Sequence, residues 1–196
     1  MDRTIAAGMA RRGFRDLIED RRGLLDADRY EAVVELIARV VAEAFKSGNK
    51  VLWMGNGGSA ADAQHLAAEF SGRFLRERPA LASEALSVNS SAVTAIANDY
   101  GYEQVFARQV EAFARPGDVV IGLSTSGNSK NIIRALEQAK RQKALTIAFS
   151  GNGGGGLKAV ADITLVGPDG YSALVQEVHI TMGHIMCDLV EQALFG

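Results

Sequence analysis

A short stretch rich in hydroxyl residues, GLSTSGNSKN (122–131, the hydroxyl loop), could bind an anion. Its four hydroxyls, on Ser124, Thr125, Ser126 and Ser129, come just before a stretch of helical periodicity. The free N–H groups and the dipole at a helix N-terminus favour an anion, and hydroxyls add further donors. A helix cap with ordinary turn residues is the alternative, but one cap needs one hydroxyl rather than four. The loop therefore predicts a phosphate site.

Two glycine-rich turns also follow predicted strands. These are WMGNGGSA (53–60, the first glycine turn) and FSGNGGGG (149–156, the last glycine turn). The first approximates the dinucleotide pattern G-x-G-x-x-G, but the next predicted strand ends in Val88 rather than in an acidic residue that would hold a ribose. No Gly-Lys-Ser/Thr ending marks a triphosphate loop. A phosphorylated small sugar fits better. The last glycine turn, whose four consecutive glycines offer no side-chain donors, is predicted to be only a turn.

Histidine and carboxylate side chains at helical spacing could bind a metal. His65 and Glu69 are four residues apart on a predicted helix, which makes either a pair of metal ligands or a surface ion pair. Gln176 and His184 lie eight residues apart on another helix, about 80° from each other around its axis. His179 lies about 140° from His184 and cannot easily share that face. Spacing alone leaves the ion pair, a buried core histidine and a four-residue metal site open.

The elements that must position these residues follow from periodicity. Helical patterns are expected at 14–25, 30–44, 59–70, 91–97, 101–114, 129–142, 157–161 and 172–195, and strands at 51–54, 84–88, 118–123, 144–149 and 162–166. Alternation of helices with continuously apolar strands predicts the α/β class, a three-layer α/β/α sandwich around a five-stranded parallel sheet. We expect a single domain over 1–196, with N-terminal helices (1–48), an α/β core (49–171) and a C-terminal helix (172–196).

Composition limits the classes of partner. The 196 residues carry a net charge of −2, which gives no reason to expect nucleic acid or an acidic membrane as the main partner. The one cysteine, Cys187, lies in an apolar helical pattern and is predicted to be a small core residue in a reducing compartment. No apolar run approaches the roughly 18 residues of a membrane span, and the N-terminus lacks a signal-peptide core. A cytoplasmic protein is expected.

Four separated motifs resemble the phosphoheptose isomerases, which belong to the sugar isomerase (SIS) domain superfamily and have a flavodoxin-like sheet. The motifs are GNGGSAADAQH-x3-E (55–69), TAIANDYGY (94–102), GLSTSGNS (122–129) and QEVHITMGHI (176–185), and the resemblance runs from about residue 28 to the C-terminus. It implies conversion of sedoheptulose 7-phosphate to D-glycero-D-manno-heptose 7-phosphate, the first step toward bacterial ADP- or GDP-heptose and the lipopolysaccharide core. It also implies a cytoplasmic homotetramer with active sites between subunits and one zinc ion per subunit.

The resemblance assigns roles to individual residues. The metal ligands it implies are His65, Glu69, Gln176 and His184. The substrate-binding residues it implies are Asn56, Gly57, Gly58, Glu69, Arg73, Asn98, Asp99, Ser124, Thr125, Ser126, Ser129 and Gln176. Glu69 would be the base of an enediol(ate) mechanism and His184 the group that moves protons at oxygen. The chain departs from the family at Asn89, where Asp is frequent, and at Ala173 and Leu174, where a polar or charged pair is common.

Three other functions compete with this hypothesis. A non-catalytic SIS protein that binds the bacterial replication initiator would lack the acid at Glu69, which this chain retains. A sugar-phosphate-sensing regulator would carry a DNA-binding segment, and no such segment is evident in the sequence. An isomerase of another ketose phosphate is the third. The set of His65, Glu69, Gln176 and His184 favours a heptose, and a panel of ketose phosphates would decide between them.

Overall fold

The computed structural model describes residues 14–196, so part of the expected N-terminal helical region (1–48) lies outside the described residues. The helices are α1 Phe14–Arg22, α2 Ala27–Lys46, α3 Gly58–Ser71, α4 Ser90–Tyr100, α5 Val105–Phe113, α6 Lys130–Arg141, α7 Gly155–Val160 and α8 Ser172–Phe195. The strands are β1 Val51–Met54, β2 Ser83–Ala85, β3 Val119–Ser124, β4 Leu145–Ser150 and β5 Ile163–Val166, and short 3-10 turns occur at η2 Tyr102–Gln104 and η3 Asn152–Gly154.

The five strands form one parallel sheet in the order β2-β1-β3-β4-β5, which confirms the predicted flavodoxin-like sheet. In this order the chain reverses its direction of winding between β1 and β3. The loops that follow these two strands are the first glycine turn and the hydroxyl loop. Open α/β sheets bind ligands in the crevice at this reversal point, beyond the carboxyl ends of the strands.

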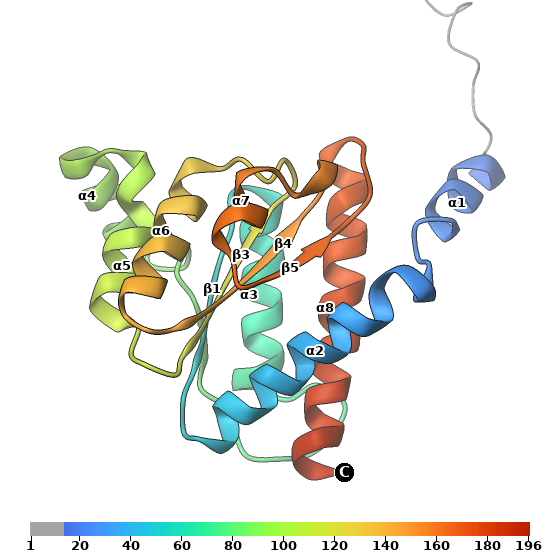
Figure 1. The fold of residues 1–196 in the computed structure, drawn as a ribbon, viewed down its shortest axis with the longest axis horizontal. Helices are drawn as coiled ribbons and strands as arrows, with labels where there is room; N and C mark the ends of the chain where they lie inside the picture. Colours follow the sequence, from blue (N-terminus) through green and yellow to red (C-terminus); the bar gives the residue numbers. More distant parts are fainter. Residues whose placement is uncertain (1–13) are drawn as a thin grey trace, which may run out of the picture.

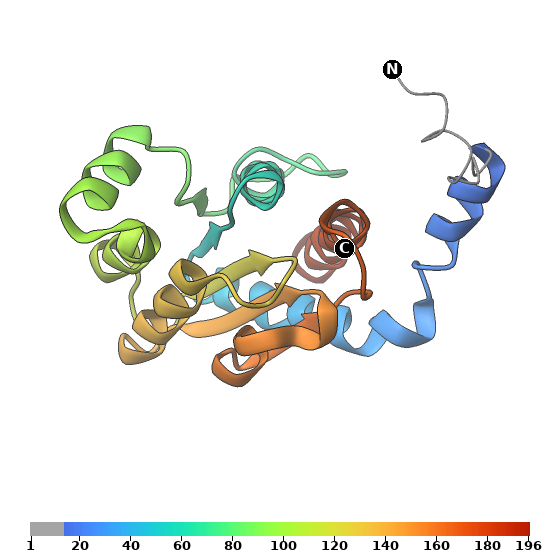
Figure 2. The same cartoon turned by 90° about the horizontal axis from the view of Figure 1, so that it is seen from above.

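Alternate strand residues face two separate cores, which confirms the three-layer sandwich. Residues such as Trp53 and Ile121 pack with α2, α3 and α8 on one face of the sheet. Residues such as Met54 and Val120 pack with α5, α6 and α7 on the other. The side-chain alternation of a strand produces this division, because successive residues point to opposite faces. The two views of Figures 1 and 2 show these helices on either side of the sheet, with α1 extending away from the body.

Several elements begin or end one to four residues from their expected bounds, and two of these differences have a visible cause. The helix expected over 101–114 is interrupted: Gly101, at φ 86°, ends α4, a 3-10 turn follows, and α5 begins only at Val105. The strand expected at 84–88 ends at Ala85, because the chain turns there and the Val88 N–H donates to the Ala85 carbonyl. The two differences lie on either side of α4, which has no buried residue of its own.

None of the described helices combines the length and apolar character that a membrane crossing requires.

Candidate active site

Helices α3 and α8 bring three of the predicted site residues together. The Nε2 atoms of His65 and His184 lie 2.9 Å apart, and His65 Nε2 lies 3.1 Å from a carboxylate oxygen of Glu69. One ligand atom from each of these residues lies within 4.8 Å of the others. We call these three residues the His–Glu cluster. Residues over a hundred positions apart in the sequence therefore form one potential ligand set.

Small side chains allow the two helices to approach. The inward face of α3 includes Ala63 and Ala67, both buried. On α8, Gly183 faces Leu66, and a Cβ at this glycine would lie 2.6 Å from a Leu66 methyl carbon. Any larger residue at position 183 would force either the Leu66 side chain or one of the helices to shift. These small residues of α3 and α8 thus permit the close spacing between the helices on which the His–Glu cluster depends.

The His–Glu cluster fits a zinc ion or a similar divalent metal. Two imidazole nitrogens and a carboxylate oxygen are a common zinc donor set. Two ligands about 2.0 Å from a tetrahedral zinc lie about 3.3 Å apart, close to the separations of 2.9 and 3.1 Å measured here. Burial and the neighbouring His65 lower the pKa of His184, although Glu69 offsets part of this shift. His184 is therefore favoured in its neutral form, which metal binding requires.

The side chain of Gln176, the fourth predicted metal ligand, lies against the start of α3 rather than at the His–Glu cluster. Its side-chain amide packs against Gly58 at the start of α3, so closely that a Cβ at Gly58 would lie 2.5 Å from the amide nitrogen. The eight residues between Gln176 and His184 correspond to about 12 Å along the helix axis. The structure thus places Gln176 beside the first glycine turn, and its role as a metal ligand stays a prediction.

The hydroxyl loop forms a hydrogen-bonded turn at the N-terminus of α6. Ser124, at the end of β3, is buried, and its Oγ lies 2.8 Å from Ser129 Oγ and 3.4 Å from Ser126 Oγ. Thr125 Oγ1 lies 3.0 Å from Oγ of Ser172, the first residue of α8. Three of the four hydroxyls therefore cluster before the N-terminus of α6, while the fourth, on Thr125, joins the loop to α8, the helix that carries His184.

The side chain of Asn56 turns toward protein neighbours. Its Nδ2 donates to Asn131 Oδ1 at 3.0 Å, and Asn131 Nδ2 donates back at 2.8 Å. The Tyr102 hydroxyl also donates to Asn56 Oδ1, at 2.9 Å. Sequence reasoning assigned no role to Asn131 or Tyr102, although both stand in quoted motifs, at the end of the hydroxyl loop and in TAIANDYGY.

The other predicted substrate residues lie at exposed positions. Asn98 and Asp99 stand near the end of α4, where the amide of Asn98 donates to the Asp99 carboxylate at 2.8 Å. Arg73, in the loop after α3, forms a loose ion pair with Glu77 at 3.8 Å. No contact with the His–Glu cluster or the hydroxyl loop is recorded for any of the three, so their roles stay predictions. Asn89 caps α4 by accepting from the Ala92 N–H, as Asp would.

Cys187 occupies the core, as predicted, and His179 is buried there as well. His179 is fully buried, its ring packs edge-on against Phe149, and neither ring nitrogen has a hydrogen-bond partner among the described residues. Burial lowers the pKa of His179 to about 4, an effect that the nearby Ser150 carbonyl only partly offsets. Cys187 is also fully buried, and burial raises the pKa of its thiol. Neither residue belongs to the His–Glu cluster, although the Glu69 carboxylate lies near enough to Cys187 to add to the rise of its pKa.

Comparison with known proteins agrees with this geometry. A family model described as SIS domain matches residues 24–151. The phosphoheptose isomerase of Trichlorobacter lovleyi is 55% identical over 172 residues, which cover 88% of this chain and 87% of that protein. That of Akkermansia muciniphila is 48% identical over 176 residues, 87% of this chain and 93% of that protein.

Solved structures lead to the same family. The structure of phosphoheptose isomerase from Neisseria gonorrhoeae superposes with a TM-score of 0.83 at 38% identity, covering 96% of this chain and 97% of that one. That from Francisella tularensis also gives a TM-score of 0.83, at 33% identity, and covers 92% of this chain and 100% of that one. The chain therefore belongs to the phosphoheptose isomerases, a family of SIS-domain proteins.

Proposed function

We propose that this protein is an aldose–ketose isomerase that converts sedoheptulose 7-phosphate to D-glycero-D-manno-heptose 7-phosphate. The observation that carries the proposal is the His–Glu cluster, which α3 and α8 form from His65, Glu69 and His184. A carboxylate and an imidazole at hydrogen-bond range of each other can move a proton between adjacent carbons and between their oxygens. Membership of the phosphoheptose isomerases supplies the substrate, a phosphorylated seven-carbon sugar.

We propose zinc as the metal, one ion per subunit. His65, Glu69 and His184 would hold it, and Gln176 would join them by turning its side chain away from Gly58 toward the cluster. When bound, a zinc ion polarises a carbonyl oxygen and stabilises negative charge that develops there. The donor set supports zinc, while a similar divalent ion would use the same residues.

The residues of this chain divide the reaction between them. Glu69, whose side chain is 19% exposed, takes the proton from the carbon beside the ketone and returns it to the neighbouring carbon through an enediol(ate). His184 moves the proton between the two oxygens. Glu69 is also a predicted ligand, and a metal-bound carboxylate is a weaker base, so Glu69 must shift between these roles or share one of them.

The loops that follow the carboxyl ends of β1 and β3 would bind the substrate. Ser124, Thr125, Ser126 and Ser129 and the N-terminus of α6 would anchor the phosphate. The backbone of Asn56, Gly57 and Gly58 would follow the sugar chain, because the side chain of Asn56 is already hydrogen-bonded within the protein. Fixing the phosphate at one end orients the reacting carbons at the other.

A panel of phosphorylated ketoses tests the function. The wild-type protein is expected to isomerise sedoheptulose 7-phosphate with a higher kcat/KM than phosphorylated hexuloses and pentuloses. Glu69→Gln and His184→Gln should each lower kcat by about 10²–10⁴-fold, the usual range for a lost acid or base. Metal content measured on the same samples separates lost proton transfer from lost metal. Near wild-type rates in both variants would remove this mechanism, and a preference for another ketose would identify a different isomerase.

We propose that residues 1–196 form one SIS domain and that four copies assemble with active sites between subunits. We also propose that the protein works in the cytoplasm of a bacterium that uses heptose for lipopolysaccharide or another glycan. A groove of about 380 Å³ between α2 and α8 supports the assembly. Leu25 and Ile185 line this groove, and both are exposed in the single chain. Covering such a groove with a second copy would remove apolar surface from water.

A further inference from the structure

The loop after α3 is fastened to α8 by a buried ion pair that no catalytic role explains. The side chains of Arg78 and Glu191 are 1% and 0% exposed, and Arg78 Nε lies 2.9 Å from Glu191 Oε1. We call this pair and its hydrogen bonds the Arg78–Glu191 clasp. Breaking a buried pair is costly, because the remaining charge is left uncompensated. Such a pair therefore holds the segments that it joins in one arrangement.

On one side, Arg78 caps the helix that carries two residues of the His–Glu cluster. Its Nη2 donates to the carbonyl of Glu69 at 2.7 Å. Its Nη1 donates to three more carbonyls, those of Phe70, Gly72 and Pro79. The last turn of a helix leaves its carbonyls without partners, and a cation there also complements the helix dipole. Arg78 thus fixes the backbone of Glu69 itself.

On the other side, Glu191 fixes a residue that touches His184. Its carboxylate accepts from the N–H groups of Phe74, Leu75 and Arg76. These bonds and Arg78 outweigh the effect of burial and lower the pKa of Glu191, so that it stays charged. The ring of Phe74 stacks on His184, with ring centroids 5.6 Å apart and planes 15° from parallel. The clasp thus has one arm on Glu69 and one on the imidazole of His184.

We propose that Arg78 and Glu191 are positioning residues that set the placement of Glu69 against His184, a role that rests on the function proposed above. Neither residue need touch the substrate or the metal. Mutation of groups that orient metal ligands typically lowers metal affinity or activity by about 10–100-fold. A carboxylate and an imidazole on separate helices need such a constraint, because a small shift between the helices changes their separation directly.

The test compares clasp variants with a matched buried carboxylate elsewhere. Glu191→Gln removes the charge, and Arg78→Lys keeps the charge but cannot reach four carbonyls at once. Asp118→Asn is the control: Asp118 is 1% exposed and accepts from Lys50 Nζ, Lys50 N and Arg115 N, beside the start of β1 and away from the His–Glu cluster. All three variants are expected to lower the melting temperature.

Only the clasp variants should alter the site. In the full-length protein without metal, the ring-proton NMR signals of His184 should move in Glu191→Gln and Arg78→Lys. Their zinc affinity, measured against a chromogenic chelator, should fall about tenfold. Their kcat for sedoheptulose 7-phosphate should fall about tenfold, with KM within about twofold of wild type. Phe74→Leu, which keeps the clasp and removes the ring contact, should also move the His184 signals and serves if a clasp variant does not fold.

The outcomes are separable. If the clasp variants only lose stability, as Asp118→Asn does, and keep wild-type His184 signals and zinc affinity, the clasp is merely structural and the proposal is wrong. If the wild-type protein binds no zinc or does not isomerise the sugar, the proposed function fails. The His184 signals of the metal-free protein still decide the role of the clasp.

Discussion

At the scale of single residues, the side chain of Asn56, a predicted substrate-binding residue, supports the first glycine turn. Its side-chain oxygen accepts from Asn131 and Tyr102, and its nitrogen donates to Asn131. The reciprocal amide pair joins the first glycine turn to α6. The backbone of Asn56, Gly57 and Gly58 is then the part of this turn that remains for a substrate. The residue type was recognised from the motif, whereas the direction of its side chain depends on α6, seventy-five positions away.

We expect Asn131→Asp to weaken substrate binding. A carboxylate at this position presents an oxygen to Asn56 Oδ1 instead of the present Nδ2–H donor. An unpaired buried polar group costs about 1–3 kcal/mol. This corresponds to a rise in KM of roughly 5- to 150-fold if the first glycine turn moves. Tyr102→Phe, which removes the other donor to the same oxygen, should raise KM less because Tyr102 is exposed. An unchanged KM in Asn131→Asp would show that the pair does not support the substrate site.

His179 should make the protein sensitive to acid. Its pKa of about 4 in the fold lies below the ordinary value of 6.5, so between these values the unfolded chain binds a proton that the folded chain does not. Protonation then favours unfolding, and the fold loses about 2–3 kcal/mol between pH 7.5 and 4.5 from this group alone. His179→Leu, of similar volume, should show a flatter dependence of melting temperature on pH over this range. Parallel curves for the two proteins would contradict the prediction.

At the scale of elements, the last glycine turn supports the hydroxyl loop. Gly127, at φ 68°, lies against it so closely that a Cβ would be 2.3 Å from the Gly154 carbonyl oxygen. The Asn152 side chain donates to the carbonyls of Thr125 and Gly170, which joins the hydroxyl loop to the approach to α8. The turn predicted from sequence is therefore present, and its glycines serve close backbone packing.

Gly127→Ala and Gly153→Ala form a matched pair that tests this packing. Both residues have positive φ, but a Cβ at Gly153 would meet nothing within 4 Å. Each alanine costs about 1–2 kcal/mol for its left-handed backbone. Only Gly127→Ala must also displace the hydroxyl loop. We therefore expect its KM for the sugar phosphate to rise by more than about tenfold, which corresponds to about 1.4 kcal/mol. Gly153→Ala should keep the wild-type KM. Equal KM values in steady-state assays of the two variants would count against the supporting role.

Sequence periodicity predicted the strands, the layers and most helices, because these depend on local alternation of apolar residues. It missed the break at Gly101, since VFARQVEAF continues the helical pattern and gives no sign that the preceding turn is 3-10. It could place Gln176 and His184 on one side of a helix, but not α3 beside α8. The contact of Phe74 with His184 carried no local signal. The loop that carries Phe74 is held by the ion pair of Arg78 with Glu191, and these two residues are 113 positions apart in the sequence.

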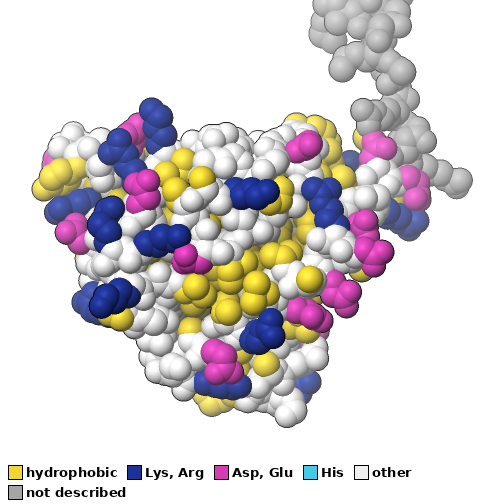
Figure 3. Space-filling model, viewed as in Figure 1, with side chains coloured by type: hydrophobic (Ala, Val, Ile, Leu, Met, Phe, Trp, Pro, Cys, Tyr) yellow, Lys and Arg dark blue, Asp and Glu magenta, His cyan; other side chains and the backbone are white. Residues whose placement is uncertain are grey.

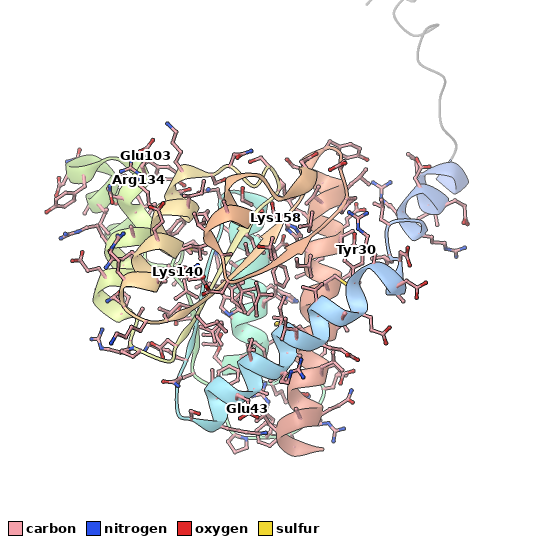
Figure 4. All side chains as sticks on the ribbon, in the orientation of Figure 1. Tyr30, Glu43, Glu103, Arg134, Lys140 and Lys158 are labelled. Carbon is pink, nitrogen blue, oxygen red and sulfur yellow. The ribbon has the colours of Figure 1, made fainter. Side chains whose placement is uncertain are left out.

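At the scale of the whole molecule, charge and apolar surface are unevenly distributed. The face in Figure 3 carries Lys, Arg, Asp and Glu side chains around a central group of apolar ones. In Figure 4, Glu103 and Arg134 lie together where η2 meets α6, and they form an ion pair. Tyr30, on α2, instead lines the apolar groove beside α8. The groove is therefore the better candidate for contact with another copy of the chain.

Leu25→Glu should weaken the proposed tetramer. Leu25 lines the groove and is 47% exposed in the single chain, so a second copy could bury its side chain. Burial of a leucine contributes about 1.5–3 kcal/mol, and a glutamate there would add a desolvation cost in each interface. Phe113→Glu is the control, because Phe113 is 53% exposed but ends α5 on the opposite face of the sheet.

Light scattering after gel filtration should find a smaller assembly for Leu25→Glu and the wild-type mass for Phe113→Glu. If the active sites form between subunits, kcat/KM should fall with the loss of the tetramer and recover as protein concentration rises, since association follows mass action. A dissociated Leu25→Glu variant with full activity at all concentrations would show that each chain carries a complete site. In that case the site would need the residues of one subunit alone, namely His65, Glu69, His184 and the hydroxyl loop. Gln176 would then be the first residue to test for a link between the His–Glu cluster and the hydroxyl loop.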